Sequence, residues 1–179
     1  QDLPWGDIHG HTIARVQVMD DLQCRLLRPG YGFRRRHVRP QHEVTLTRAF
    51  EILSSELADI AAYLADPDCR LLSLVGPGGI GKTRLAVEAA AQAVERYADG
   101  VFFVPLASLQ SAEAIVPAVA QALGFSLSGA REPVAQLLGY LRRRKALLLV
   151  LDNYEHLLDG AGIVIEILQA APGVQVLAT

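Results

Sequence analysis

The chain has 179 residues, of which 51% are hydrophobic and 20% charged, a mixture typical of a globular, core-forming protein and not of a disordered one. Its formal net charge of −2 excludes a strong overall attraction to nucleic acid or membrane surfaces. We see neither a signal peptide nor a run of roughly 20 apolar residues, as a membrane span requires, and we therefore expect a cytoplasmic protein with no membrane partner.

Residues 1–42 differ in composition from the remainder of the chain. Glycine and proline recur there, residues 34–39 form a basic run, and only residues 12–18 have the apolar character of a strand. Because most of this segment lacks a helical or strand periodicity, it is predicted to be a poorly ordered linker or the remnant of an upstream region. The chain starts at Gln1 and not at Met, so we also expect a piece of a longer protein.

A helix is predicted at the start of the second region, residues 43–179. Apolar residues recur at steps of three and four from Leu46 to Leu64, which is the spacing of one helix face. Pro67 follows closely, and since proline disfavours the helical conformation in the residue before it, we expect the helix to end there.

Four short apolar runs alternate with helical segments after this helix. They are predicted as strands at residues 71–75, 101–104, 146–151 and 174–178. The intervening helices are predicted at residues 82–97, 111–123, 133–144 and 153–170. We expect Ser111 to cap the second of these helices and the last one to be interrupted near residues 159–162. Strands that are apolar throughout are buried on both faces, so the pattern predicts a three-layer α/β fold with a parallel sheet.

A glycine-rich turn after strand 71–75 matches the phosphate-loop pattern G-x-x-x-x-G-K-[ST] at every required position. Glycines let the backbone curl so that its N–H groups converge on phosphates, and the positive end of the next helix points to the same place. The lysine reaches the β- and γ-phosphates, and the threonine offers a hydroxyl to Mg²⁺. We therefore predict ATP or ADP as the ligand and Mg²⁺ as the cofactor. The predicted nucleotide-binding residues are Gly76, Pro77, Gly78, Gly79, Ile80, Gly81, Lys82, Thr83 and Arg84, the last of which fits a solvated position at least as well.

An aspartate at the end of another apolar strand supplies the second half of such a site. Asp152 directly follows residues 146–151, and an acidic residue in that place holds Mg²⁺ through a water molecule. The same residue could instead cap the helix that follows it. Given the phosphate loop, we predict that Thr83 and Asp152 are the magnesium-side residues and that Asp152 is catalytic.

Hydrolysis also needs a group that orients or deprotonates the attacking water. Many P-loop ATPases have an acidic residue directly after the magnesium aspartate, but this chain has Asn153, which cannot accept a proton as a carboxylate does. Glu155 is the nearest catalytic candidate, and complementing the dipole of the next helix explains it equally well. This arrangement predicts slow turnover and a nucleotide-gated switch.

Two stretches, LSLVGPGGIGKTRLA at residues 72–86 and LVLDNYEHLL at residues 149–158, resemble the motifs of NB-ARC-type STAND ATPases of bacterial LuxR-like and SARP-like transcriptional regulators. The resemblance covers residues 55–179. It implies an ASCE-type, AAA+-like sheet whose fourth strand lies between the first and the third. It also implies an ATP/ADP switch that couples the sensing of a signal to oligomerisation or to an effector.

The chain departs from this family at two places. Family members usually have a Gly-Arg pair before the helix that precedes the first strand, and residues 47–53 lack it. A Ser-Arg pair that senses the γ-phosphate follows the fourth strand in the family, whereas this chain ends at Thr179. We therefore expect a C-terminally truncated domain.

Three hypotheses about function remain open. The first is the nucleotide-binding core of a signal-transducing regulator of transcription, which hydrolyses ATP slowly, self-associates through this domain and contacts DNA only through a missing effector domain. The second is an AAA+-type motor or remodelling ATPase that uses Glu155 as its catalytic residue. The third is a non-catalytic fragment in which the sheet edge beside the first strand is uncovered.

Overall fold

The computed structural model describes residues 14–17, 55–79, 81–129 and 132–179, the first range as backbone only. Residues 55–65 are helical, and this helix ends before Pro67 as expected. None of the described helices is long and apolar enough to cross a membrane. The strands are β1 (Ala14–Gln17), β2 (Leu71–Val75), β3 (Val101–Pro105), β4 (Leu147–Asp152) and β5 (Val174–Ala178). The helices are α3 (Lys82–Gln92), α4 (Ile115–Ala122), α5 (Pro133–Leu141) and α6 (Ala161–Ala170), with 3₁₀ turns η1 (Val94–Arg96), η2 (Ala112–Ala114), η3 (Tyr154–His156) and η4 (Leu158–Gly160).

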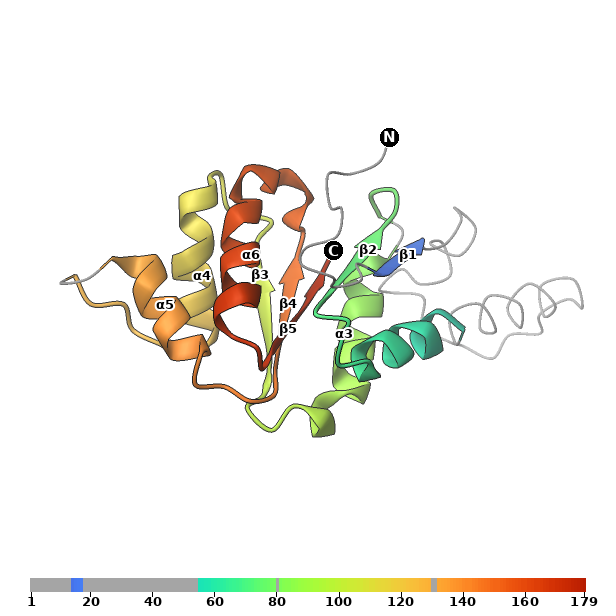
Figure 1. Cartoon of the computed structure of the whole chain (residues 1–179). Coiled ribbons are helices and arrows are strands. Elements are labelled where there is room, and N and C mark those ends of the chain that lie inside the picture. Colours follow the sequence, from blue (N-terminus) through green and yellow to red (C-terminus); the bar gives the residue numbers. More distant parts are fainter. Residues whose placement is uncertain (1–13, 18–54, 80, 130–131) are drawn as a thin grey trace, which may run out of the picture.

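The strands form one parallel sheet in the order β1-β2-β5-β4-β3 (Figure 1). All four strands predicted after residue 70 are present. The last of them, β5, lies between β2 and β4, as the family resemblance implied. The predicted α/β fold with a parallel sheet is therefore confirmed, and the carboxyl ends of β2, β5 and β4 meet at one edge, where ligands bind in open α/β sheets.

The structure differs from the sequence prediction at the sheet edge beside β2. The third hypothesis, a non-catalytic fragment, left this edge uncovered, but β1 pairs with β2 in parallel register, from Ala14 with Leu72 to Gln17 with Val75. The strand-like piece at residues 12–18 thus contributes a strand that meets the backbone groups of β2, which an edge strand would leave unpaired. The domain boundary at residue 42 stays a prediction.

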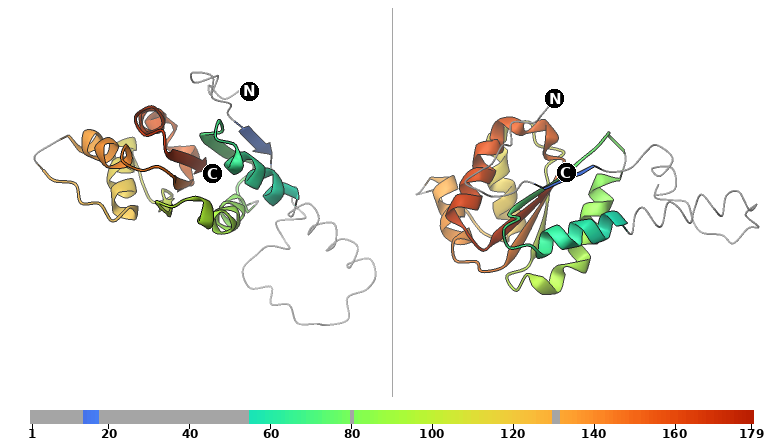
Figure 2. Two further views of the ribbon diagram at one scale, coloured as in Figure 1. Left: turned by 60° about the horizontal axis from the view of Figure 1, so that its bottom comes forward. Right: turned by 45° about the vertical axis from the view of Figure 1, so that its right-hand side comes forward.

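Helices cover both faces of the sheet (Figures 1 and 2). α4, α5 and α6 pack on one face, and α3 with helix 55–65 packs on the other. The side chains of β4 alternate between these layers: Leu147, Leu149 and Leu151 enter the first core, and Leu148 and Val150 enter the second. Burial on both faces explains why this strand is apolar at every position before its last.

Helix starts and interruptions agree with the sequence in part. Ser111 stands at the cap position of η2, but its side chain makes no capping bond. A hydrogen bond from Ser111 to the carboxylate of Glu113 lowers the pKa of that group. At α5, Pro133 occupies the first turn as expected, and Glu132 caps the helix by accepting bonds from two backbone N–H groups. The segment 153–170 is not one helix with an interruption near residues 159–162: η3 and η4 come first, and α6 begins only at Ala161.

Two charged side chains anchor the amino ends of the strands. Arg70, directly before β2, donates to the carbonyl oxygens of Val174 at 2.8 Å and Ala171 at 2.7 Å. Asp99, before β3, accepts bonds through Oδ2 from the backbone N–H groups of Lys145 at 2.6 Å and Ala146 at 3.0 Å. These contacts hold neighbouring strands in register, and their carboxyl ends therefore come to a common level.

Candidate functional site

The glycine-rich turn joins the carboxyl end of β2 to the amino end of α3, as the sequence predicts. Gly79 and Gly81 have φ values of 80° and 99°, in a region that other L-residues rarely adopt. An added Cβ at Gly79 would meet no atom within 4 Å, so the backbone angle and not crowding requires this glycine. Gly81 is the N-cap residue of α3, so the first N–H groups of the helix open toward the turn. Ile80 lies outside the described residues.

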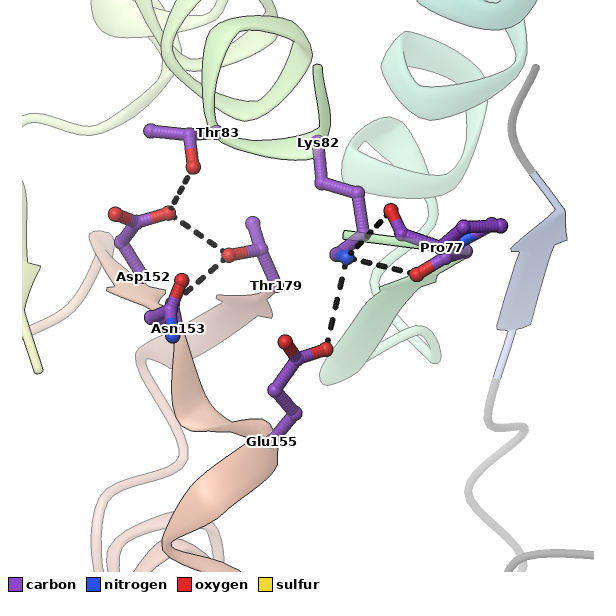
Figure 3. Close-up of polar contacts among 8 residues, drawn as sticks. Pro77, Lys82, Thr83, Asp152, Asn153, Glu155 and Thr179 are labelled. Atoms are coloured by element: carbon purple, nitrogen blue, oxygen red, sulfur yellow. Dashed lines mark hydrogen bonds and ion pairs between the residues drawn. The ribbon is translucent and has the colours of Figure 1, made fainter. Parts of the chain in front are cut away.

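The ammonium group of Lys82 lies inside this turn (Figure 3). It donates to the carbonyl oxygens of Gly76 at 2.8 Å and Pro77 at 3.3 Å, and it lies 3.5 Å from Oε2 of Glu155. The Lys82 side chain is only 10% exposed. A cation surrounded by oxygen atoms at a helix N-terminus is placed where phosphate oxygens would also be bound.

The second predicted pair of residues is in direct contact. The Thr83 hydroxyl, in the first turn of α3, donates to Oδ1 of Asp152 at 2.6 Å (Figure 3). Asp152 is the last residue of β4, and α3 packs across that strand, which explains why residues 69 positions apart meet. A hydroxyl and a carboxylate next to each other form an oxygen donor set of the kind that Mg²⁺ prefers.

The turn after β4 carries the remaining predicted residue. Asn153 has a φ of 65°, the one positive value of a non-glycine residue in the described ranges, and it redirects the chain into η3. Glu155 in η3 thereby reaches Lys82, although its own side chain is 57% exposed. His156 points elsewhere, since its Nε2 lies 3.0 Å from the carbonyl oxygen of Leu109.

The last predicted nucleotide-binding residue, Arg84, is exposed in the first turn of α3.

A family comparison adds to this geometry. A family model described as an AAA domain matches residues 65–173, which include the glycine-rich turn, Thr83, Asp152 and Glu155. The chain belongs to the AAA domain family. This membership indicates nucleotide binding, and it agrees with the α/β fold and parallel sheet.

Relatives of the AAA domain are much longer proteins. A Mycobacterium bovis protein, provisionally named an HTH-type transcriptional regulator, is 40% identical over 111 residues, which are 62% of this chain and 12% of that protein. An uncharacterized protein of Mycobacterium tuberculosis is 32% identical over 126 residues, 70% of this chain and 31% of the relative. An uncharacterized WD repeat-containing protein of Nostoc is 30% identical over 119 residues, 59% of this chain and 9% of the relative. No solved structure matches the chain. The chain thus spans less than a third of each of these relatives.

One residue of the site in this AAA domain was missed by the sequence reasoning. Thr179, directly after β5, donates its hydroxyl hydrogen to Oδ1 of Asp152 at 2.8 Å and accepts the backbone N–H of Asn153 at 2.9 Å (Figure 3). Its carbonyl oxygen also accepts the N–H of Tyr154 at 2.7 Å. The signal was available, because parallel strands end at the same sheet edge and β5 was expected beside β4.

Proposed function

We propose that this AAA domain is the Mg²⁺-dependent ATP/ADP-binding switch of an NB-ARC-type STAND regulator. The observation that carries the proposal is the 2.6 Å contact between the Thr83 hydroxyl and the Asp152 carboxylate. It joins the phosphate-loop motif to the acidic end of β4, and a nucleotide site needs both on the same edge of the sheet. Lys82, held inside the turn, supplies the charge for the phosphates.

The residues at this edge fit a magnesium ion. The Thr83 hydroxyl donates its hydrogen to Asp152 and keeps its oxygen lone pairs for a cation. When bound, Mg²⁺ neutralises charge that develops on the phosphate oxygens. We assign Thr83 and Asp152 to hold the ion, Asp152 through water, and the turn of residues 76–81 with Lys82 and Arg84 to bind the nucleotide.

The turn after β4 supports slow hydrolysis. Asn153 stands where a second carboxylate would follow the aspartate, and its amide cannot take a proton from water. Glu155 is the next carboxylate in the sequence after Asp152, and its Oε2 is paired with the ammonium group of Lys82 at 3.5 Å. A domain with these residues keeps its nucleotide long enough to act as a switch.

The relatives support an output in transcription. One bears the name of an HTH-type transcriptional regulator, and the 111 residues that match this chain are 12% of its length. We propose that residues 43–179 form the switch domain of such a cytoplasmic protein, that it self-associates through this domain, and that DNA is contacted only by parts outside this chain.

Binding of labelled ADP to the purified chain tests the proposal. Lys82→Ala removes a charged hydrogen-bond donor, and we expect its affinity to fall about 10- to 100-fold, since such bonds contribute roughly 1.5–3 kcal/mol. Lys145→Ala is the matched control, because it removes an exposed lysine before β4 and leaves the turn unchanged. Equal affinity of the Lys82 variant and the wild type would overturn the proposal.

A second candidate is a motor-type AAA+ ATPase, which the 57% exposed carboxylate side chain of Glu155 beside the glycine-rich turn favours. A carboxylate in this position could orient the attacking water. The motor predicts turnover well above about one per minute, abolished by Glu155→Gln. The switch predicts that the same substitution frees Lys82 and raises nucleotide affinity by up to about fivefold, because an exposed ion pair contributes at most about 1 kcal/mol.

A further inference from the structure

The hydrogen bonds of the Thr179 hydroxyl have a defined direction. Thr179 is only 7% exposed. In the described part of the chain, Lys82 is the one other polar or charged residue that is buried. The N–H of Asn153 can only donate, so the Thr179 oxygen accepts that bond. The single hydroxyl hydrogen then goes to Oδ1 of Asp152 at 2.8 Å.

Two hydroxyl groups therefore converge on one oxygen of Asp152. Thr83 donates to Oδ1 from α3, and Thr179 donates to the same atom from β5. Within the described residues, Oδ2 has no hydrogen-bond partner. A carboxylate that is held on one oxygen from two sides has little freedom to rotate, and its second oxygen stays available.

The backbone of Thr179 makes separate contacts that do not need the hydroxyl. Its N–H donates to the carbonyl oxygen of Leu151 at 3.0 Å, and its carbonyl oxygen accepts the N–H of Tyr154 at 2.7 Å. A change of the side chain alone therefore leaves the link between β5 and the turn after β4 in place. The role of the hydroxyl can be separated from that of the strand.

We infer that Thr179 is a positioning residue that holds the carboxylate of Asp152 in the orientation needed for the magnesium side of the nucleotide site. The inference rests on the proposed function. Outer partners of metal ligands orient them, and their loss typically weakens metal affinity by about 10- to 100-fold. Because Thr179 acts on Asp152, which would itself hold the ion through water, the effect lies at the lower end, near tenfold.

The test compares ADP binding to the full chain with Mg²⁺ and with EDTA. In Thr179→Val, which keeps the shape and loses the hydroxyl, the gain in affinity on adding Mg²⁺ is expected to fall about tenfold relative to the wild type. Thr179→Ser, which restores the hydroxyl, is expected to recover most of that gain. A uniform loss of folded protein changes both affinities alike and leaves their ratio unchanged, so a purely structural role would not move this readout.

Ser128→Ala is the control, since it removes a hydroxyl that bonds Gln136 in the loop between α4 and α5. If the wild type responds to Mg²⁺, two results would overturn the inference while the proposed function stands. One is an unchanged ratio of the affinities with Mg²⁺ and with EDTA in Thr179→Val, and the other is no recovery of that ratio in Thr179→Ser. A wild type that binds ADP without any effect of Mg²⁺ would overturn the proposed metal site and the inference with it. A wild type that binds no ADP would overturn the proposed function itself.

Discussion

The glycine-rich turn after β2 and the turn after β4 form opposite sides of one site, and both use left-handed backbone. The first does so with Gly79 and Gly81, at φ values of 80° and 99°, and the second with Asn153, at 65°. The first turn follows from its own sequence, because glycines and the helix start lie within eight residues. The second turn depends on Thr179, which binds the side chain of Asp152 and the backbone of the next two residues. One side is thus a local motif, whereas the other needs the assembled sheet.

The largest expected effect distinguishes the two sides by their dependence on Mg²⁺. Asp152→Asn keeps the side-chain shape and removes the charge, so the affinity for Mg²⁺ with nucleotide should fall about 10- to 100-fold. Binding of ADP in EDTA should change little, because the glycine-rich turn and Lys82 are intact. Titration calorimetry with and without Mg²⁺ measures both values. An equal loss in EDTA would mean that the two sides do not act separately.

A second prediction concerns the left-handed residues themselves. Gly81→Ala forces a Cβ into a left-handed conformation, so the free energy of unfolding should fall by about 1–2 kcal/mol. Asn153→Gly removes a Cβ from such a conformation, and we expect a change within about 0.5 kcal/mol, because the gain in backbone freedom also stabilises the unfolded chain. Urea denaturation measures both values.

Gly139→Ala is the control for this pair. Gly139 lies in α5, and an added Cβ there would meet no atom within 4 Å, so alanine should stabilise the helix by up to about 1 kcal/mol. If Gly81→Ala were as harmless as the control, the glycine-rich turn would not require its left-handed residue.

The smallest expected effect concerns the amino end of β4, where Asp99 accepts hydrogen bonds from the two residues directly before the strand. The N–H groups of Ala146 and Lys145, and more weakly the guanidinium of Arg144, lower the pKa of the Asp99 carboxyl. A folded pKa below the unfolded value of about 3.9 stabilises the fold at higher pH, and this contribution is lost as the pH falls through the folded value. Asp99→Asn should therefore lower the melting temperature at pH 7 and weaken its decline between pH 5 and 3.

Melting curves of the wild type, Asp99→Asn and Asp159→Asn across this pH range measure the effect. Asp159 is an exposed carboxylate in η4, so its variant should follow the wild type. Parallel curves for the wild type and the Asp99 variant would show that the amino end of β4 is not held by this carboxylate.

The contrast between a turn set by its own sequence and a turn that needs the assembled sheet explains what the sequence could and could not predict. β2 and β5 have the predicted bounds, because apolar runs between a proline or glycine turn and a polar residue are local signals. The glycine-rich turn and Asp152 were found for the same reason. Thr179 was seen only as the residue that follows the fourth strand, since the partners of its hydroxyl are 26 and 27 positions away in sequence.

The local rules for helix caps also failed at two helix starts. Ser111 was expected to cap a helix, yet its side chain makes no capping bond. Glu132 was overlooked as a cap, although it accepts two backbone bonds at the start of α5. The pairing of β1 with β2 joins segments that are far apart in the chain, and no periodicity within either segment encodes that contact.

The bond between Arg70 and Val174 spans 104 positions, and this has a consequence for biosynthesis. The glycine-rich turn leaves the ribosome long before β5, the strand that completes β2 on its inner side. Pairing over such a sequence separation is slow, and it waits for the later segment. A nascent chain that ends before β5 carries the turn without Thr179 and without the inner neighbour of β2. We therefore expect nucleotide to be captured only after β5 has docked, so that occupancy itself marks a sheet that contains β5 and protects it from proteolysis.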